Sequence, residues 1–299
     1  MLRRRAKPLL GTLVEIGIGL MDGDDATALG RADEAINAAF AEIALIHDLM
    51  SFHRVESDVG RINASPRGTS INVDRRTAAV LSAAWQAAQE SRHAFDCTIA
   101  DELVTMALLP ALWPERLTRS GAFVLPTDGQ WCIEDQTFIK QSDCMIDLGG
   151  IAKGYAVDQA FDILQRAGCT RVLINAGGDM RQCGDAPTIV HLRSADDAAN
   201  MPLALGLHNQ ALASSAAGGL YAHGVGSKSS IINGLSRQPI GVGAAASVIA
   251  PSCMDADILT KVVLVSDNPE HPMLARHHAR VVQYNSAEQF IASTYESQP

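Results

Sequence analysis

A glycine pair followed by a lysine is the clearest chemical signal in this sequence. Residues 147–158 read Asp-Leu-Gly-Gly-Ile-Ala-Lys-Gly-Tyr-Ala-Val-Asp. Glycines before a helix let backbone N–H groups approach an anion, and the helix start adds partial positive charge. Lys153 would add a full charge, so the run predicts a phosphate site, with a structural turn and a surface lysine as the alternative. The spacing matches neither the P-loop nor the dinucleotide fingerprint.

Two other segments carry oxygen-rich side chains. Residues 175–179 read Asn-Ala-Gly-Gly-Asp, and Asp179 is a candidate hydrogen-bond acceptor for a ribose or a ring. The alternative is a turn at a strand end with a local side-chain bond. Asp257 and Thr260 lie three residues apart at a predicted helix start and share one face. Such hard oxygen ligands suit Mg²⁺, whereas helix capping by Asp255 or Asp257 is the alternative.

The composition is that of an ordinary globular protein and excludes several functions. Of 299 residues, 47% are hydrophobic and 19% are charged. The formal net charge of −9 argues against nucleic-acid binding. No stretch reaches the roughly 18 apolar residues of a membrane span. The basic run at residues 3–7 is interpreted as a solvated tail, and the six cysteines, which lack metal-site spacing, as buried free thiols in a reducing compartment.

Periodicity predicts the elements that position these residues. Apolar side chains at three- and four-residue steps predict a long helix over 26–50, and Asp74 is the predicted N-cap of a second helix ending near Ser91. A strand at 144–147, a helix at 151–167 and a strand at 171–175 would form a βαβ-like unit. Further strands are expected at 10–18, within 186–215 and at 246–250. A helical turn is expected to end at Asn63, and another helix to start at Asp255. Loops and short strands are expected at 110–141, and a long, partly mobile loop at 218–243.

These elements predict an α/β chain. We expect one unit over residues 1–299, and the alternative of two closely packed subdomains stays open. His271, His277 and His278 have no partners at a suitable spacing and are interpreted as surface residues.

Six segments, in chain order, resemble the FAD:protein FMN transferase family, the ApbE-like flavin transferases. One such motif would be weak, but six in order over most of the chain are specific. The segments are Leu10–Thr12, Met50–Asn63, Phe95–Thr98, Asp147–Asp158, Asn175–Asp179 and Ala256–Lys261.

The resemblance implies a T-fold-like α/β (α+β) architecture, in which mixed sheets and packed helices surround an FAD cleft. It implies FAD and Mg²⁺ at the site, with the metal neutralising the pyrophosphate. The implied cofactor-binding residues are Leu10, Phe52, His53, Ala94, Phe95, Asp96, Asp147, Gly149, Gly150, Lys153, Asp179, Ser214, Ser215 and Ile231. The implied metal positions are Gly150, Ala152, Asp257, Thr260 and, by position only, Lys261.

The sequence departs from the family pattern at several of these positions. His53 stands where the family has a flavin-stacking Tyr, and Lys261 where it has a metal-site Thr. The family's opening Met is Leu10, and its Thr-Ser-Gly loop reads Ser-Ser-Ala over residues 214–216. Its His-Ile-Ile-Asp-Pro-x-Thr-Gly motif reads Ser-Ile-Ile-Asn-Gly-Leu-Ser-Arg over residues 230–237. Ser230 cannot serve as a general base at neutral pH, so His223 of the same loop is the candidate catalytic residue.

The function implied is Mg²⁺-dependent transfer of FMN from FAD to a Thr or Ser hydroxyl of a partner protein, with release of AMP. Two alternatives follow from the departures: a protein that binds FAD without transferring FMN, and one that hydrolyses FAD to FMN and AMP. The expected partners are FAD and a flavin-accepting protein, with no nucleic acid and no membrane span. We expect the chain as given to be cytoplasmic, and periplasmic if an export signal has been removed.

Overall fold

The computed structural model describes residues 2–19, 26–114, 129–192, 203–218, 229–284 and 290–292. Its largest element is an antiparallel sheet of eight strands in the order β1-β2-β6-β7-β10-β11-β12-β13. The strands are β1 (Leu2–Leu9), β2 (Thr12–Gly19), β6 (Val172–Ala176), β7 (Asp179–Cys183), β10 (Ala211–Ala216), β11 (Ala245–Ala250), β12 (Arg280–Tyr284) and β13 (Phe290–Ala292).

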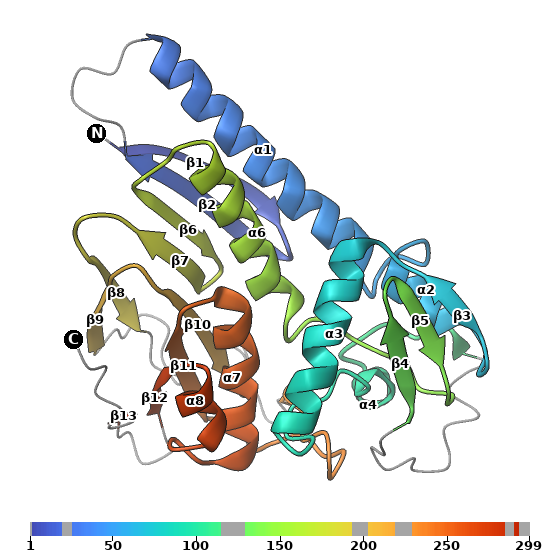
Figure 1. Cartoon of the computed structure of the whole chain (residues 1–299). Helices are drawn as coiled ribbons and strands as arrows, with labels where there is room; N and C mark the ends of the chain where they lie inside the picture. Colours follow the sequence, from blue (N-terminus) through green and yellow to red (C-terminus); the bar gives the residue numbers. More distant parts are fainter. Residues whose placement is uncertain are drawn as a thin grey trace.

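Three helices lie across one face of this sheet (Figure 1). They are α1 (Ala26–Met50), α6 (Ala152–Arg166) and α7 (Cys253–Ser266). Helix α6 packs against both α1 and α7. Gly154 permits the close approach of α6 to α7, because a Cβ there would lie 2.4 Å from the Cys253 carbonyl oxygen. The start of α6 is therefore held against the first turns of α7.

Smaller elements lie beyond the end of α1 (Figure 1). They are α2 (Asp58–Ala64), α3 (Arg75–Glu90), α4 (Ala100–Thr105) and the sheet β3-β5-β4, formed by β3 (Ser70–Asn72), β5 (Thr137–Lys140) and β4 (Trp131–Glu134). The short helix α8 (Pro272–Arg276) precedes β12. A hairpin of β8 (Thr188–Leu192) and β9 (Leu203–Leu207) buries Val190 and Leu207 in a separate apolar cluster with Leu212 and Ile249 of the main sheet.

The mixed α/β class is confirmed, as are most of the predicted elements. Helix α1 has the predicted bounds, and Asp74 caps α3 by accepting a hydrogen bond of 2.8 Å from the Arg76 N–H. Helix α6 is one residue shorter at each end than predicted. Helix α7 begins before the predicted Asp255, because Ser252 is its N-cap. The prediction of one unit over 1–299 stays a prediction, as does the mobility of the 218–243 loop.

The predicted strand at 144–147 is wrong, and so is the βαβ-like unit. This segment pairs with no neighbouring strand among the described residues: Asn63 exchanges hydrogen bonds with Ile146, Asp101 accepts one from the Met145 N–H, and the Asp147 N–H donates to the Cys97 carbonyl of a loop. Its backbone is satisfied without a sheet, which sequence periodicity cannot distinguish from strand pairing. Strand β6 runs antiparallel to both β2 and β7.

The basic run at the N-terminus is an edge strand and not a solvated tail. Arg3 forms an ion pair of 2.9 Å with Asp33 of α1, and the Lys7 ammonium lies 4.9 Å from the Phe40 ring centre. The predicted strand at 10–18 begins later, because Leu10 and Gly11 form the β1–β2 turn with φ of +55° and +70°. Edge strands often carry basic residues, since charge discourages pairing with another chain.

Two of the three C-terminal histidines make contacts that the sequence did not predict. His277 lies between two carboxylates, 3.2 Å from Glu90 of α3 and 3.3 Å from Asp255 of α7. His271 is the N-cap of α8 and accepts a hydrogen bond from the Met273 N–H. The carboxylates come from elements distant in sequence, which explains why residue spacing showed no partner.

Candidate functional site

A pocket of about 380 Å³ lies where the start of α6 faces the loop before α4. Of the predicted cofactor-binding and metal positions, its walls include Ala94, Phe95, Asp96, Asp147, Gly149, Gly150, Lys153, Ser215, Ile231 and Lys261. Ser230 also lines it. Residues more than 100 positions apart in the sequence thus meet in one hollow.

A second hollow of about 320 Å³ adjoins the first. It is lined by four more of the predicted positions, Leu10, Phe52, His53 and Ala152. Asp147, Gly149 and Lys153 line both hollows, so the glycine turn stands between them. The arrangement suits an elongated ligand with an anionic middle and a less polar group at each end.

The glycine turn is shaped by Asp147. The carboxylate accepts a hydrogen bond of 3.1 Å from the Gly149 N–H, and a Cβ at Gly149 would lie only 2.9 Å from the same oxygen. Burial raises the pKa of Asp147, an effect opposed by the Gly149 N–H bond and the charge of nearby His53. Ile151, at the N-cap of α6, makes no side-chain capping bond. Within this turn the Ala152 N–H donates to the Leu148 carbonyl and the Gly154 N–H donates to Asp257, so Lys153 is the group of the first turn that brings positive charge to the pocket.

Lys153 extends from that first turn to Asp179. Its ammonium lies 2.5 Å from one Asp179 oxygen, whereas the other oxygen is buried without a hydrogen-bond partner among the described residues. Burial raises the pKa of Asp179 to about 6, with the charge of Asp257 adding to the effect. Burial alone would lower the pKa of Lys153, but the Asp179 and Asp257 carboxylates raise it above its usual value. Asp179 positions Lys153 and does not line either hollow.

Asp257 is fully buried at 0% exposure, and its oxygens are already engaged. One carboxylate oxygen contacts the Lys261 ammonium, and the other accepts a hydrogen bond of 3.2 Å from the Gly154 N–H. The Asp257 carbonyl accepts bonds from Lys261 at 3.0 Å and from the Thr260 hydroxyl at 2.7 Å. That hydroxyl also lies 2.7 Å from the Ser215 hydroxyl.

This donor set does not fit a divalent cation as it is folded. Mg²⁺ requires near-octahedral oxygen ligands, but the Asp257 oxygen that would bind it holds an ammonium group. Among the described residues, no group of three or more His, Cys, Asp or Glu side chains is arranged to hold a metal. Lys261 faces the pocket, whereas Asp257 and Thr260 lie behind its wall.

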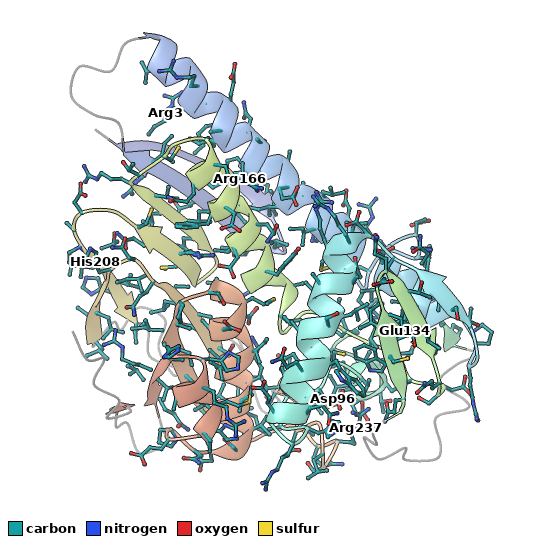
Figure 2. All side chains as sticks on the ribbon, viewed as in Figure 1. Arg3, Asp96, Glu134, Arg166, His208 and Arg237 are labelled. Carbon is teal, nitrogen blue, oxygen red and sulfur yellow. The ribbon has the colours of Figure 1, made fainter. Side chains whose placement is uncertain are left out.

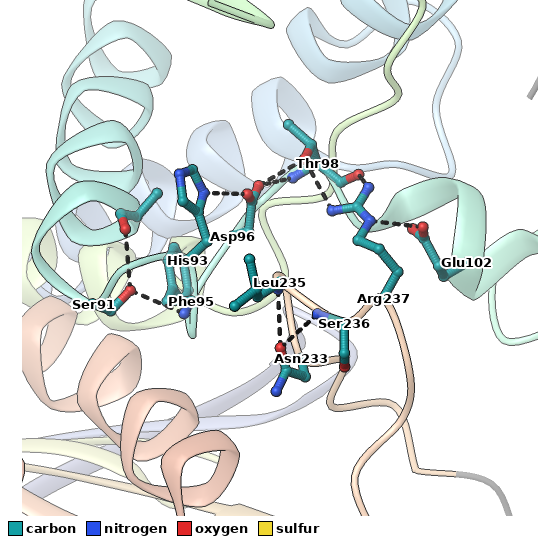
Figure 3. A network of polar contacts seen from close by, with 11 residues as sticks. Ser91, His93, Phe95, Asp96, Thr98, Glu102, Asn233, Leu235, Ser236 and Arg237 are labelled. Carbon is teal, nitrogen blue, oxygen red and sulfur yellow. Dashed lines mark hydrogen bonds and ion pairs between the residues drawn. The ribbon is translucent and has the colours of Figure 1, made fainter. Parts of the chain in front are cut away.

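Asp96 lines the pocket and organises the polar contacts of its wall between Phe95 and Thr98 (Figure 3). Its carboxylate accepts hydrogen bonds from the N–H and the hydroxyl of Thr98, at 2.8 and 2.7 Å, and lies 2.8 Å from the His93 ring. Burial would raise the pKa of Asp96, but these bonds lower it below its usual value. Asp96 is thus held as a carboxylate beside the buried Phe95 ring.

Residues 230–237, where the family motif is altered, are anchored to that wall. The Arg237 guanidinium is 6% exposed and donates to Glu102 at 2.8 Å and to the Thr98 hydroxyl at 3.2 Å (Figures 2 and 3). Gly234 lets this loop lie close to Asp96, because a Cβ at position 234 would lie only 2.5 Å from the Asp96 Cβ. The Asn233 side chain accepts from the Leu235 and Ser236 N–H groups and closes the turn.

Two supporting residues were not predicted as such. Asp158 accepts hydrogen bonds of 2.9 Å from the N–H groups of Cys253 and Met254, so it caps the start of α7 and fixes it to α6. Arg237 has no sequence signal beyond being the one charged residue of the segment 230–237. Asp158 did have a sequence signal, because it is the last acidic residue of the glycine-containing run 147–158. The N–H groups that it caps, however, lie about a hundred residues later in the chain.

The remaining predicted positions fall outside the pocket walls. Ser214 bonds across the sheet to the Ser247 hydroxyl at 2.7 Å. Asn175 makes the predicted alternative, a local bond of 2.9 Å from the Gly178 N–H to its side chain. His223 lies outside the described residues, so its catalytic role stays a prediction.

Comparison with known proteins decides the family. The model of the ApbE family matches residues 10–284. This chain belongs to the ApbE family. Curated relatives named FAD:protein FMN transferase come from Klebsiella pneumoniae (strain 342), 27% identical over 51% of this chain and 50% of that protein, and from Vibrio cholerae serotype O1, 26% identical over 46% and 43%. The matched stretch spans about half the length of these curated relatives or less.

Solved ApbE structures share the fold of this ApbE-family chain from end to end. The Thermotoga maritima ApbE protein superposes with a TM-score of 0.82, 21% identity and coverage of 98% of this chain and 97% of that one. The apo Pseudomonas stutzeri flavinyl transferase ApbE gives a TM-score of 0.79, 20% identity and coverage of 98% and 95%. At these identities the likeness establishes the fold.

Proposed function

We propose that this ApbE-family protein transfers FMN from FAD to a Thr or Ser hydroxyl of a partner protein and releases AMP. The observation that carries the proposal is the pair of hollows that meet at the glycine turn. A dinucleotide has two ring systems joined by a pyrophosphate. Lys153 beside the glycine turn and Lys261 of α7 would face that pyrophosphate, and one hollow would hold each ring system.

In this proposal, the residues of the chain act mainly by positioning and by charge. Phosphoryl transfer depends on an in-line approach of the attacking oxygen and on neutralising the phosphate oxygens. The acceptor hydroxyl would form a bond to the FMN phosphorus while the bond to the AMP oxygen breaks. Lys153 would stabilise the charge that develops, and its pairing with buried Asp179 would fix its position. The hydroxyl proton needs an acceptor, for which His223 stays the predicted residue.

The resemblance also predicts Mg²⁺, which when bound would add charge neutralisation at the pyrophosphate. That requirement stays a prediction from the resemblance. The engaged oxygens of Asp257 and Thr260 do not support it in this chain, so no step above depends on a metal.

The test is incubation with FAD and an acceptor peptide that carries one Thr. A mass gain of one FMN on the peptide, with one AMP released per transfer, is the expected result. The control peptide carries Val in place of that Thr and should gain nothing. Intact FAD and an unmodified peptide, with and without Mg²⁺, would contradict the proposal.

A second candidate is FAD binding without transfer, or hydrolysis of FAD to FMN and AMP. Ser230, an exposed wall residue of the pocket that does not titrate at neutral pH, favours it. Chromatography separates the three cases: binding leaves FAD intact, hydrolysis gives free FMN and AMP, and transfer gives AMP with peptide-bound FMN.

Partners and location complete the proposal. A flavin-accepting protein follows from the reaction, and the net charge of −9 supports the absence of a nucleic-acid partner. Within the described residues, no helix has both the length and the apolarity to cross a membrane. None of the six cysteines is in a disulfide, which supports a reducing compartment such as the cytoplasm, with the periplasm as the alternative.

A further inference from the structure

Four charged side chains are gathered behind and beside the glycine turn. Lys153 pairs with Asp179 and Lys261 pairs with Asp257. The two pairs lie close enough to interact, because the charges of Asp257 and Lys261 both shift the pKa of Asp179. The carboxylates are buried, whereas both lysines reach the pocket wall. The site therefore places two lysine side chains at the pocket wall, and their ammonium groups pair with buried counter-charges behind it.

Lys261 lies where a metal bound to Asp257 would have to lie. Its ammonium contacts both a carboxylate oxygen and the carbonyl of Asp257, which are the oxygens that residue could offer to a cation. The aliphatic part of the Lys261 side chain passes close to Gly150: a Cβ added to that glycine would lie 3.6 Å from Lys261 Cε. Lys261 is thus directed from α7 toward the glycine turn, the second element expected to hold a metal.

We propose that the Lys261 ammonium replaces the divalent cation in this protein, so that Lys153 and Lys261 bind the FAD pyrophosphate without a metal. The inference rests on the proposed function for the identity of the ligand. A metal at Asp257 would have to displace the Lys261 ammonium from both the carboxylate oxygen and the carbonyl that it contacts, and the two cations would then repel each other at the same pocket wall. An ammonium supplies one charge and three donors and needs no coordination geometry.

The first arm of the test measures FAD binding by calorimetry on the wild-type chain, in EDTA and in Mg²⁺. We expect the same dissociation constant in both. The variant Lys261→Thr should lose about tenfold in affinity in EDTA and regain it in Mg²⁺. Lys261→Arg keeps the charge and is the matched control, which should remain insensitive to Mg²⁺. Wild-type affinity that rises about tenfold or more with Mg²⁺ would overturn the proposal.

The second arm uses Mn²⁺ alone, followed by electron paramagnetic resonance without FAD. The wild type should leave Mn²⁺ free in solution, whereas Lys261→Thr should bind it and release it when Asp257→Asn is added. Stoichiometric Mn²⁺ binding by the wild type that is lost in Asp257→Asn would overturn the inference. The wild-type measurements decide the matter even if a variant does not fold.

The two arms separate this inference from the proposed function. A chain that binds FAD equally in EDTA and Mg²⁺ but transfers no FMN would refute the transfer and leave the role of Lys261 standing. A chain that binds no FAD would refute the proposed function, and the Mn²⁺ arm would still test Lys261. Transfer that proceeds only with Mg²⁺ bound at Asp257 would refute the inference and keep the function.

Discussion

Two regions of the pocket depart from the family pattern in opposite ways. At position 261 a neutral residue is replaced by a lysine, and the new charge joins the site: its ammonium contacts Asp257 and faces the pocket. Over residues 230–237 a titratable histidine is replaced by Ser230. The loop also gains a buried arginine, Arg237, which contacts Glu102 and Thr98 and does not line the pocket. In our proposal, the change at position 261 puts an ammonium group in place of a metal ion. The change over residues 230–237 removes a side chain that could transfer a proton and adds an arginine that holds the loop in place.

The difference shows that motif departures have different consequences. A substitution that keeps the charge at a site can preserve binding, because binding depends on the electrostatic sum of several groups. A substitution that removes a proton-transfer group affects only the chemical step. Retained binding cannot make up for that loss, because binding the substrate and the transition state equally does not accelerate the reaction. This chain is therefore expected to keep its affinity for FAD more securely than its rate of FMN transfer.

The largest effect is expected at the anchor, on stability. Arg237→Met removes a buried guanidinium that bonds to Glu102 and Thr98, and it leaves a partly buried carboxylate without its ion pair. We expect a loss of about 3 kcal/mol in the free energy of unfolding, measured in urea. The control, Arg54→Met, removes an exposed ion pair with Asp48 and should cost about 0.5 kcal/mol or less. Similar losses in both variants would show that the loop is not anchored by Arg237.

The next effect tests binding at the charged region. Lys153→Met should weaken FAD binding by about a hundredfold, because it removes a pocket charge and leaves the buried Asp179 without its partner. Calorimetry on the folded variant measures it, with circular dichroism to confirm folding. Arg166→Met, at the exposed far end of the same helix, is the control and should bind as the wild type does. Unchanged affinity in Lys153→Met would place the pyrophosphate elsewhere.

The loop at residues 230–237 lacks the titratable group of the family motif, and restoring that group tests the chemical step. Ser230→His should raise the rate of FMN transfer about tenfold or more, because general acid–base catalysis is worth at least that much when geometry allows. Its dissociation constant for FAD should not change. Ser236→His places the same side chain on an exposed residue of the same loop outside the pocket wall and should not raise the rate. A rate unchanged in Ser230→His would mean that the loop lost more than its base.

The sequence predicted the pocket better than the packing that supports it. Local signals were sufficient for α1, α3 and α6, since periodicity and the Asp74 cap depend on neighbours in the chain. The glycine turn was readable for the same reason. The segment at 144–147 was mistaken for a strand because its partners, Asn63 and Asp101, are distant side chains.

The two helices that meet at Gly154 illustrate the same limit for the site. No pattern in the chain indicates that Asp158 caps α7, or that Lys261 contacts Asp257 rather than extending into solvent. Both contacts depend on the distance between α6 and α7, which is set by tertiary packing. The resemblance supplied the candidate residues, and the fold separated those that line the hollows from those that hold them in place.

His277 supplies the smallest expected effect, outside both departing regions. It lies between Asp255 at the start of α7 and Glu90 of α3, and hydrogen bonds to these carboxylates raise its pKa to about 8. A histidine with a raised folded-state pKa contributes stability that is fully present below its unfolded pKa near 6.5 and is lost as the pH rises through 8. His277→Asn should therefore cost about 1 kcal/mol of unfolding free energy just below the unfolded pKa, where Asp255 and Glu90 are still ionised, after allowance for solvent screening, and almost nothing well above the folded pKa. His278→Asn is the matched control, because the neighbouring ring is exposed and asparagine tolerates its left-handed φ of +51°. A cost for His277→Asn that does not vary with pH would assign the stabilisation to packing instead of charge, and the start of α7 would then be held by Asp158 and Ser252 without help from a titrating group.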